Sequence, residues 1–341
     1  MRTLLLTLIT CLSVLPAHAK YGGGSGTAQD PYQIATAGDL IALGETPEDY
    51  VKHFILTADI DLDPNLPGRK VFDKAVIAPD MDPAKWDFQG TQFTGVFDGD
   101  GHTISNLQIK GGSHVGLFGC VASRAEVKDL SVADFDITAS SVYVGGLLGY
   151  QSYANVTRCC STGVVSGRSY VGGLVGCNAN GRISQCYSTC VVSGGEHVGG
   201  LAGFNSGALA LCYSTGAVSA TNTVGRPPYA GGGGLVGING GSITTCYSAG
   251  VLTGSGSVGG GLVGYNGYYA SVNQCFWDTQ TSGQIWSGGG TGKTTAEMQT
   301  AKTFLDAGWD FVGETANGTE DIWWILEGKD YPRLWWEAAK K

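Results

Sequence analysis

The 341-residue sequence predicts an all-β fold, a parallel β-helix in which similar turns of chain stack along one axis. Three observations predict it: a Gly-Leu segment that recurs about every 27 residues, a Cys-Tyr-Ser segment that keeps step with it, and a composition rich in Gly and poor in charge. The winding is expected to be right-handed, with small helical and aromatic caps at both ends.

The Gly-Leu segment has the form Val-Gly-Gly-Leu-Val-Gly, as at residues 171–176. Its central leucines are spaced by 30, 27, 27, 34 and 27 residues, at Leu117, Leu147, Leu174, Leu201, Leu235 and Leu262. The Cys segments start 11 to 13 residues after a leucine, at Cys160, Cys186, Cys212, Cys246 and Cys275. Circuits of this length, stacked about 4.8 Å apart, pair through their backbones. Each circuit can bury its apolar face only against its neighbours, so equivalent residues are expected to form columns. The blades of a β-propeller would need about 40 residues or more.

Composition and charge exclude several classes of protein. Hydrophobic residues make up 43% of the chain and charged residues only 14%, so it can bury a large core and is not disordered. The 56 glycines follow no three-residue period, which excludes a collagen-like helix. The net charge is −9, and Lys and Arg are scattered singly, which argues against nucleic acid or an anionic membrane surface as a partner.

The N-terminus predicts export. Arg2 precedes an apolar stretch at residues 4–15, and Ala17-His18-Ala19 has the Ala-x-Ala form of a cleavage site. Residues 1–19 are therefore interpreted as a signal peptide that is cleaved near Ala19. No later stretch has the length of a membrane-spanning helix. We expect a chain that is secreted, periplasmic or on the cell surface, with no membrane span.

The repeated Val-Gly-Gly-Leu-Val-Gly segment resembles the GLUG-motif repeat of bacterial exported and surface proteins, over residues 115–277. The segments at residues 22–34, 53–62 and 93–104 resemble the regions that precede such repeats. The resemblance implies a β-helix, an exterior location and an adhesin-like protein. It implies little about activity, because the motif marks an architecture.

The remaining chain is divided into three parts. Residues 20–110 are expected to form an N-terminal cap and the first β-coils, residues 111–278 the repeat β-helix, and residues 279–341 a linker, a helix and a Trp-rich cap. Residues 37–50 and 294–307 are the helical candidates. Both are expected to cover an exposed end, because an open solenoid end presents unpaired strand edges.

Two features are candidates for ligand binding. The 34-residue step contains an insertion with Arg226 and Tyr229, and insertions between repeats often form the binding face of a solenoid. A neutral surface loop is the alternative. The second feature is a C-terminal aromatic cluster that includes Trp323, Trp324, Trp335 and Trp336. It could stack on sugars, or it could close the last coil as a hydrophobic lid, and the terminal position favours the lid.

Asp59, Asp61 and Asp63 alternate in the manner of Ca²⁺ ligands. The apolar residues between them equally predict a strand with one solvent-exposed face. No other cofactor is expected. The recurring cysteines are interpreted as a buried ladder of thiols, with disulfides between adjacent coils as the alternative. Cys159 and Cys160 are expected on opposite faces of their strand, and Cys120 and Cys177 in a separate column.

The scattered charges of the repeats form no carboxylate pair of the kind that hydrolyses glycosides, and no Gly-x-Ser-x-Gly nucleophile motif stands out. We therefore interpret the chain as a non-catalytic β-helix for adhesion or binding. Its expected partner is an extracellular polysaccharide or another cell-surface component. A polysaccharide lyase or glycoside hydrolase on a β-helix is the first alternative, and a structural spacer of the cell envelope is the second.

Overall fold

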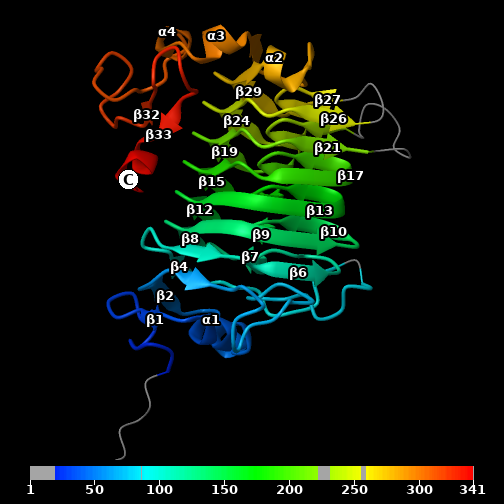
Figure 1. The fold of residues 1–341 in the computed structure, drawn as a ribbon, viewed down its shortest axis with the longest axis vertical. Helices are drawn as coiled ribbons and strands as arrows, with labels where there is room; N and C mark the ends of the chain where they lie inside the picture. The colour runs from blue at the N-terminus through cyan, green and yellow to red at the C-terminus, as the bar shows by residue number, and fades with distance from the viewer. Residues whose placement is uncertain (1–19, 86, 222–230, 255–258, 341) are drawn as a thin grey trace, which may run out of the picture.

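The computed structural model describes residues 20–340 except residues 86, 222–230 and 255–258. The predicted signal peptide at residues 1–19 lies outside this range. The chain winds into a column of stacked coils, each coil being one turn of a parallel β-helix (Figure 1). The predicted all-β parallel β-helix is confirmed.

Three parallel sheets, named A, B and C here, form the wall of the helix. Sheet A consists, in order of pairing, of β1 (Tyr32–Ile34), β2 (His53–Leu56), β4 (Val96–Asp98), β8 (Glu126–Lys128), β12 (Asn155–Thr157), β15 (Arg182–Ser184), β19 (Ala208–Ala210), β24 (Ser242–Thr244) and β29 (Ser271–Asn273). Sheet C consists of β7 (Phe118–Ala122), β11 (Leu148–Ser152), β14 (Val175–Ala179), β18 (Ala202–Asn205), β23 (Val236–Asn239) and β28 (Val263–Asn266).

Sheet B is the longest and bends around the corner that leads into sheet C. Its strands, in chain order, are β3 (Ile60–Asp61), β5 (Thr103–Ser105), β6 (Gln108–Gly111), β9 (Ser131–Ala139), β10 (Val142–Gly145), β13 (Cys160–Gly172), β16 (Tyr187–Ser188), β17 (Val191–Gly199), β20 (Tyr213–Ser214), β21 (Val218–Ala220), β22 (Gly232–Gly233), β25 (Tyr247–Ser248), β26 (Leu252–Gly254), β27 (Gly259–Gly260), β30 (Phe276–Asp278) and β31 (Thr291–Lys293). One circuit runs from sheet A through sheet B to sheet C, as β12, β13 and β14 do.

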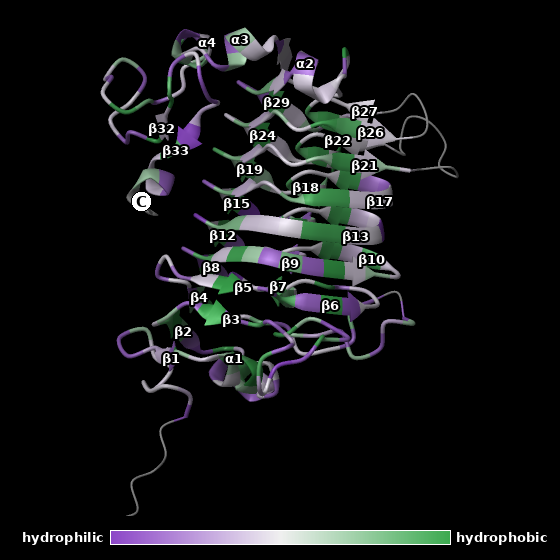
Figure 2. Ribbon diagram, in the orientation of Figure 1, coloured by the Kyte–Doolittle hydropathy of each residue, from purple (hydrophilic) through white to green (hydrophobic). Residues whose placement is uncertain are grey.

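The six central leucines form one column inside the helix. All are fully buried, and from Leu147 to Leu235 the amide of each donates to the carbonyl of its equivalent in the next coil. The amide of Leu147 donates to the carbonyl of Leu174 at 3.0 Å, and Leu174 donates to Leu201 at the same distance. Figure 2 shows apolar residues recurring at the same place in successive strands, as in β13, β17 and β21. The sequence period is therefore the circumference of one coil.

The glycines of the motif allow the coils to approach closely at the corner between sheets B and C. A Cβ atom on Gly176 would lie 2.4 Å from the backbone nitrogen of Val144 in the preceding coil. A Cβ atom on Gly173 would lie 2.0 Å from the hydroxyl of Ser188 inside the helix. Only Gly fits where another backbone or side chain comes this near, which explains why Gly surrounds each leucine.

Two further columns line the interior. Asn178 donates a hydrogen bond from Nδ2 to Oδ1 of Asn205 at 2.7 Å, and Asn205 donates in the same way to Asn239 at 2.8 Å. Gln151 continues this amide ladder at one end and Asn266 at the other. The second column contains the thiols of Cys159, Cys186, Cys212, Cys246 and Cys275, all buried in the main core.

One expectation for the cysteines was wrong: Cys159, and not Cys160, belongs to the buried ladder, because Cys160 pairs in register with Tyr187, the residue that follows Cys186. The opposite orientation of Cys159 and Cys160 and the shared column of Cys120 and Cys177 are confirmed. Cys159 packs in the main core, whereas Cys160 belongs to a second hydrophobic cluster on the outer face of the same strand. Cys120 and Cys177 both pair in register with Tyr150, so they share a separate column on sheet C. All nine cysteines of the described chain are free thiols.

Helical segments lie at both ends of the stack (Figure 1). At the N-terminal end, α1 (Ala37–Gly44) begins with a capping box between Thr36 and Asp39, buries Leu40 and Leu43, and is followed by η1 (Pro47–Asp49). The other end carries α2 (Thr279–Ser282), α3 (Thr295–Met298) and α4 (Ala301–Leu305). The chain then turns back beside the coils through the antiparallel pair β32 (Trp323–Trp324) and β33 (Arg333–Leu334) and ends in η2 (Trp335–Lys340).

Within the part of the chain that the structure describes, no helix has the length and apolar character needed to cross a lipid bilayer.

Candidate functional site: an aromatic column outside the helix

A column of rings follows the outer corner between sheets B and C. Its members are the residues that directly precede the buried valines of the repeated motif: His114, Tyr143, Tyr170 and His197. Each has a positive φ between 52° and 62°. This left-handed backbone turns the chain sharply at the corner and directs the side chain outward, while the next residue, Val144 or Val171, points into the core. The column therefore has the period of the coils.

The rings of the column are close enough to stack. The ring centroids of Tyr143 and Tyr170 lie 5.1 Å apart at 22°, and those of Tyr170 and His197 lie 4.6 Å apart at 29°. His114 stands below Tyr143 at 4.9 Å in a tilted arrangement. Tyr143, Tyr170 and His197 are half-buried, so each keeps part of its surface in contact with solvent.

A second column on sheet C supports the first. It alternates small and large side chains, with Cys120, Tyr150, Cys177 and Phe204 in register. Tyr150 meets Tyr143 edge to face at 5.4 Å, and Phe204 meets Tyr170 edge to face at 6.0 Å. Edge-to-face contacts of this kind contribute about 1 kcal/mol beyond the area that they bury. The exposed rings are thus held in fixed orientations.

The lower end of the column is closed by a buried polar cluster. Nδ1 of His114 lies 3.0 Å from Oδ2 of Asp80, and the hydroxyl of Ser113 donates to the same oxygen at 2.6 Å. The ring of Phe88 meets His114 edge to face at 5.4 Å. All three polar side chains are at most 4% exposed. This cluster anchors the segment that carries Asp80 and Phe88 to the first coil and does not open to solvent.

The tyrosine side chains of the column are neutral hydrogen-bonding groups. Burial raises the pKa of Tyr143 to about 12, and it also raises the pKa of Tyr150 and Tyr170. These phenols stay protonated at neutral pH and can donate hydrogen bonds. The hydroxyl of Ser169 lies 3.2 Å from Nδ1 of His197 and orients that imidazole. The column can therefore offer ring edges, phenol hydroxyls and an imidazole along one line.

The predicted tryptophans form part of the C-terminal cap. Trp323 is fully buried and Trp336 is 7% exposed, because both pack in the cluster that covers the column Tyr187, Tyr213, Tyr247 and Phe276. Trp324 is half-buried, and its indole donates to the carbonyl of Leu334 at 3.1 Å. Trp335 is 44% exposed. The structure thus places two of the four indoles inside the lid and leaves Trp335 the most open.

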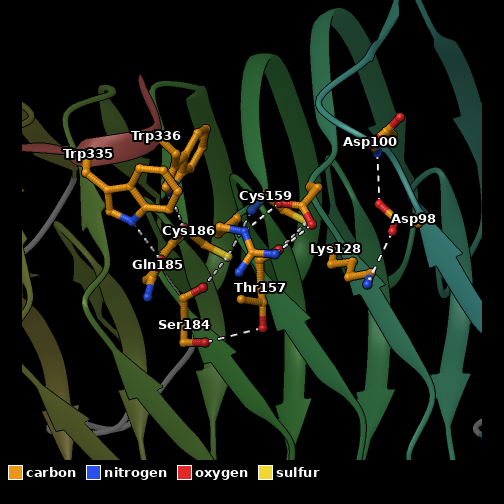
Figure 3. Close-up of polar contacts among 12 residues, drawn as sticks. Asp98, Asp100, Lys128, Thr157, Cys159, Ser184, Gln185, Cys186, Trp335 and Trp336 are labelled. Atoms are coloured by element: carbon orange, nitrogen blue, oxygen red, sulfur yellow. Dashed lines mark hydrogen bonds and ion pairs between the residues drawn. The ribbon is translucent and has the colours of Figure 1, made fainter. Parts of the chain in front are cut away.

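Figure 3 shows Trp335 and Trp336 next to each other beside Gln185, at the corner between sheets A and B. The indole of Trp336 donates to the backbone carbonyl of Gln185 at 3.2 Å, and that of Trp335 lies 3.4 Å from its side-chain oxygen. These contacts attach the end of the chain to the middle of the β-helix.

The three candidate calcium ligands do not converge. Asp59 accepts from the backbone amide of Thr103 at 2.9 Å and lies 3.0 Å from Nδ1 of His102. Asp61 accepts from Asn106 at 2.9 Å, and its pKa is lowered chiefly by this hydrogen bond. Asp63 accepts from the backbone amide of Asn65 at 3.0 Å. Across the described residues, no group of three or more His, Cys, Asp or Glu side chains is placed to hold a metal ion.

The candidate residues Arg226 and Tyr229 lie outside the described residues. The aromatic column was not among the sequence-based candidates, although its signal is present. An aromatic residue or His stands directly before four of the repeated Val-Gly segments. At the third position after the central leucine, small and large residues alternate over the first four repeats. Reading the motif one residue further toward the N-terminus would have found it.

Comparisons with known proteins agree with this architecture. The family described as the GLUG motif matches residues 167–192. Halomucin of Haloquadratum walsbyi is 32% identical over 152 residues, which cover 43% of this chain and 2% of halomucin. A candidate Gly-rich membrane protein of Evansella cellulosilytica is 42% identical over 76 residues, covering 21% of this chain and 8% of that protein. This chain thus matches only a small share of either relative.

Among solved structures, the fold is similar to that of a candidate immunoglobulin A1 protease from Bacteroides ovatus. The two share a TM-score of 0.65 and 21% identity, over 93% of this chain and 95% of that chain. An identity this low shows a common fold alone. The predicted resemblance to GLUG repeats is confirmed, and this chain carries the GLUG motif on a parallel β-helix.

Proposed function

We propose that this chain is a non-catalytic β-helix protein of the cell exterior that binds polysaccharide along its aromatic column. The observation that carries the proposal is the line of half-exposed rings Tyr143, Tyr170 and His197, held at the spacing of the coils. A linear polymer is the ligand that a line of equivalent sites fits best. Such a polymer can engage several rungs at once, so weak contacts add along the chain.

The chemistry of the column supports a carbohydrate ligand. Sugars present apolar C–H faces and many hydroxyls, and aromatic rings with polar tips can contact both. The tyrosine hydroxyls and the His197 imidazole supply donors and acceptors beside the ring surfaces. The location outside the cell is supported by the signal-like sequence of residues 1–19 and by a relative that is named a membrane protein.

The test is a screen of the exported chain, residues 20–341, against immobilised polysaccharides. It measures retained glycan together with released reducing or unsaturated ends. We expect retention without product. Release of sugar ends would overturn the non-catalytic assignment in favour of a lyase or hydrolase. Absence of any retention would support the structural spacer. Cleavage of an added immunoglobulin A1 would instead point to the activity in the name of the structural neighbour.

A variant pair locates the binding face. Tyr170→Ala removes the central ring of the column and is expected to weaken retention about tenfold, as the loss of roughly 1.4 kcal/mol of aromatic contact implies. Tyr268→Ala is the matched control, because Tyr268 is 92% exposed on the loop between β28 and β29. Equal retention by Tyr170→Ala and the unchanged protein would refute the assignment of this face.

A further inference from the structure

A second polar site lies at the other edge of sheet C, where each coil turns into sheet A. An open groove of about 640 Å³ crosses four successive coils at this corner. Its principal lining side chains belong to Arg124, Tyr153, Asn155, Asn180, Arg182 and Ser206. Both arginines, Tyr153 and both asparagines are exposed. The groove thus combines two cations with amide and hydroxyl groups.

The backbone at this corner is tightly specified. Arg124, Tyr153 and Asn180 have φ values of 68°, 55° and 57°, which turn the chain sharply in each coil. The amide of Arg124 donates to the carbonyl of Tyr153 at 3.0 Å, and the amide of Tyr153 donates to the carbonyl of Ala179 at 3.0 Å. Arg182 begins β15 and pairs in register with Asn155. The two arginines therefore lie two coils apart, with Tyr153 and Asn155 in the coil between them.

The amide ladder inside the helix makes the corner rigid. The side chain of Asn178 accepts from the amide of Gly181 at 3.1 Å and donates to its carbonyl at 3.3 Å. Gly181 is buried between the exposed Asn180 and Arg182. These two buried hydrogen bonds between Asn178 and Gly181 hold the backbone that carries the exposed residues.

The charges of the groove differ from those of two cations on or beside sheet A, Lys128 and Arg158. Lys128 lies 3.2 Å from Asp98, as Figure 3 shows, and Arg158 donates from Nη2 to Asp129 at 2.7 Å. Those two cations are neutralised within the protein. Within the described part of the chain, neither Arg124 nor Arg182 forms an ion pair with a carboxylate. The same column of sheet A carries Glu126, which Asn155 separates from Arg182.

We propose that the groove formed by Arg124, Arg182, Asn155 and Asn180 binds an anionic group, a sulfate or carboxylate, carried by an acidic polysaccharide. The planar guanidinium group pairs with such oxyanions through two parallel hydrogen bonds. The asparagine amides and the Tyr153 hydroxyl can donate to and accept from the neighbouring sugar hydroxyls. This site is independent of the aromatic column and adds a charged ligand class to the neutral contacts there.

The negative net charge of the chain restricts where a polyanion can bind. A chain with a net charge of −9 repels a polyanion at long range, so binding requires a local positive site. Exposed charge pairs weaken as salt rises, so the affinity is expected to fall with ionic strength.

The experiment measures the affinity of the exported chain for dextran sulfate and carboxymethyl dextran, with neutral dextran and free sodium sulfate as comparison arms. We expect both acidic dextrans to bind more tightly than neutral dextran, which can contact only the aromatic column. The double substitution Arg124→Gln with Arg182→Gln is expected to weaken that binding at least tenfold. Arg168→Gln, which removes an exposed charge on sheet B, is expected to leave it within about twofold.

Several outcomes would overturn the proposal. An equal loss of affinity in Arg168→Gln would show that the polyanion responds to the overall charge of the protein and does not bind specifically in this groove. Saturation of the groove by free sulfate at the same concentration as by polymer sulfate would identify a site for a small ion. Unchanged binding in the double variant would exclude both arginines. The thermal midpoint of each variant is measured alongside, and Tyr170→Ala tests the aromatic column separately, so the two proposals can fail independently.

Discussion

The hydroxyl of Tyr213 donates a hydrogen bond to Oε2 of Glu337 at 2.8 Å, across 124 positions of sequence. Tyr213 stacks between Tyr187 and Tyr247, with centroids 4.9 Å from each and ring planes within 8° of parallel. Trp323 and Trp336 lie over this outer column. The last segment of the chain thus covers a flat tyrosine stack that the repeats alone would expose to solvent.

Removal of a lid indole should uncouple the C-terminal segment. Trp323→Ala is expected to lower the free energy of unfolding of this segment by about 3–5 kcal/mol, because a fully buried Trp is lost against Tyr213 and Tyr247. Urea unfolding followed by tryptophan fluorescence measures the effect. Trp335→Ala, at a residue that is 44% exposed, should change the unfolding midpoint little. Similar losses in both variants would contradict the lid.

The interior amide ladder should contribute strongly to stability. Asn205→Ala removes the two ladder hydrogen bonds and two longer ones to the backbone of Gly207 and Ser242, and it leaves Asn178 Nδ2 and Asn239 Oδ1 without their ladder partner. The expected loss is about 3 kcal/mol, because buried polar groups lose their partners. Gln151→Met is the control, since it removes only the last ladder bond, from Nε2 of Gln151 to Asn178, and Oε1 of Gln151 is buried without a partner among the described residues. A loss in Gln151→Met as large as that in Asn205→Ala, read from chemical denaturation, would argue against the ladder as the cause.

The thiols should be unreactive in the folded protein. Burial raises the pKa of Cys120 and of Cys177 to about 12 and that of Cys190 to about 11, so thiolates are scarce at pH 8. A chromogenic disulfide reagent should therefore modify no thiol before unfolding and nine after it. Fewer than nine in denaturant without a reductant would instead indicate disulfides.

Mild acid should destabilise the first coils through His114. Burial lowers the pKa of His114 below its usual 6.5, and this effect outweighs the nearby Asp80 carboxylate, which raises it. The unfolded chain then takes up a proton at a pH where the folded chain does not. Stability is fully present above pH 6.5 and falls as the pH drops from 6.5 to the folded pKa, by up to about 1.4 kcal/mol per pH unit.

The matched variant for this effect is His114→Asn, which keeps a short donor toward Asp80 and tolerates the positive φ of 52°. Denaturation midpoints at pH 7.5 and pH 5 should differ less in this variant than in the unchanged protein. An identical pH dependence in both would assign the effect to other groups.

The interior could be predicted from the sequence because every coil places the same types of side chain at the same positions against its neighbours. The leucine column, the two faces of the Cys159-Cys160 pair and the common column of Cys120 and Cys177 follow from period and strand alternation. The amide ladder has the same period, since Asn178, Asn205, Asn239 and Asn266 each follow a central leucine by four residues. The sequence signal for it was equally present.

The sequence by itself determined the β-helix, its period and which residues enter the core, because those features depend on contacts between one coil and its nearest copy. Only the tertiary structure decided which outer columns are covered and which face solvent. The tyrosine column is buried by a segment 124 residues away, whereas the aromatic column and the arginine groove stay open. The sequence period does not indicate which outer column is covered, since the covering segment is not a repeat and contacts the coils only after the chain has folded back.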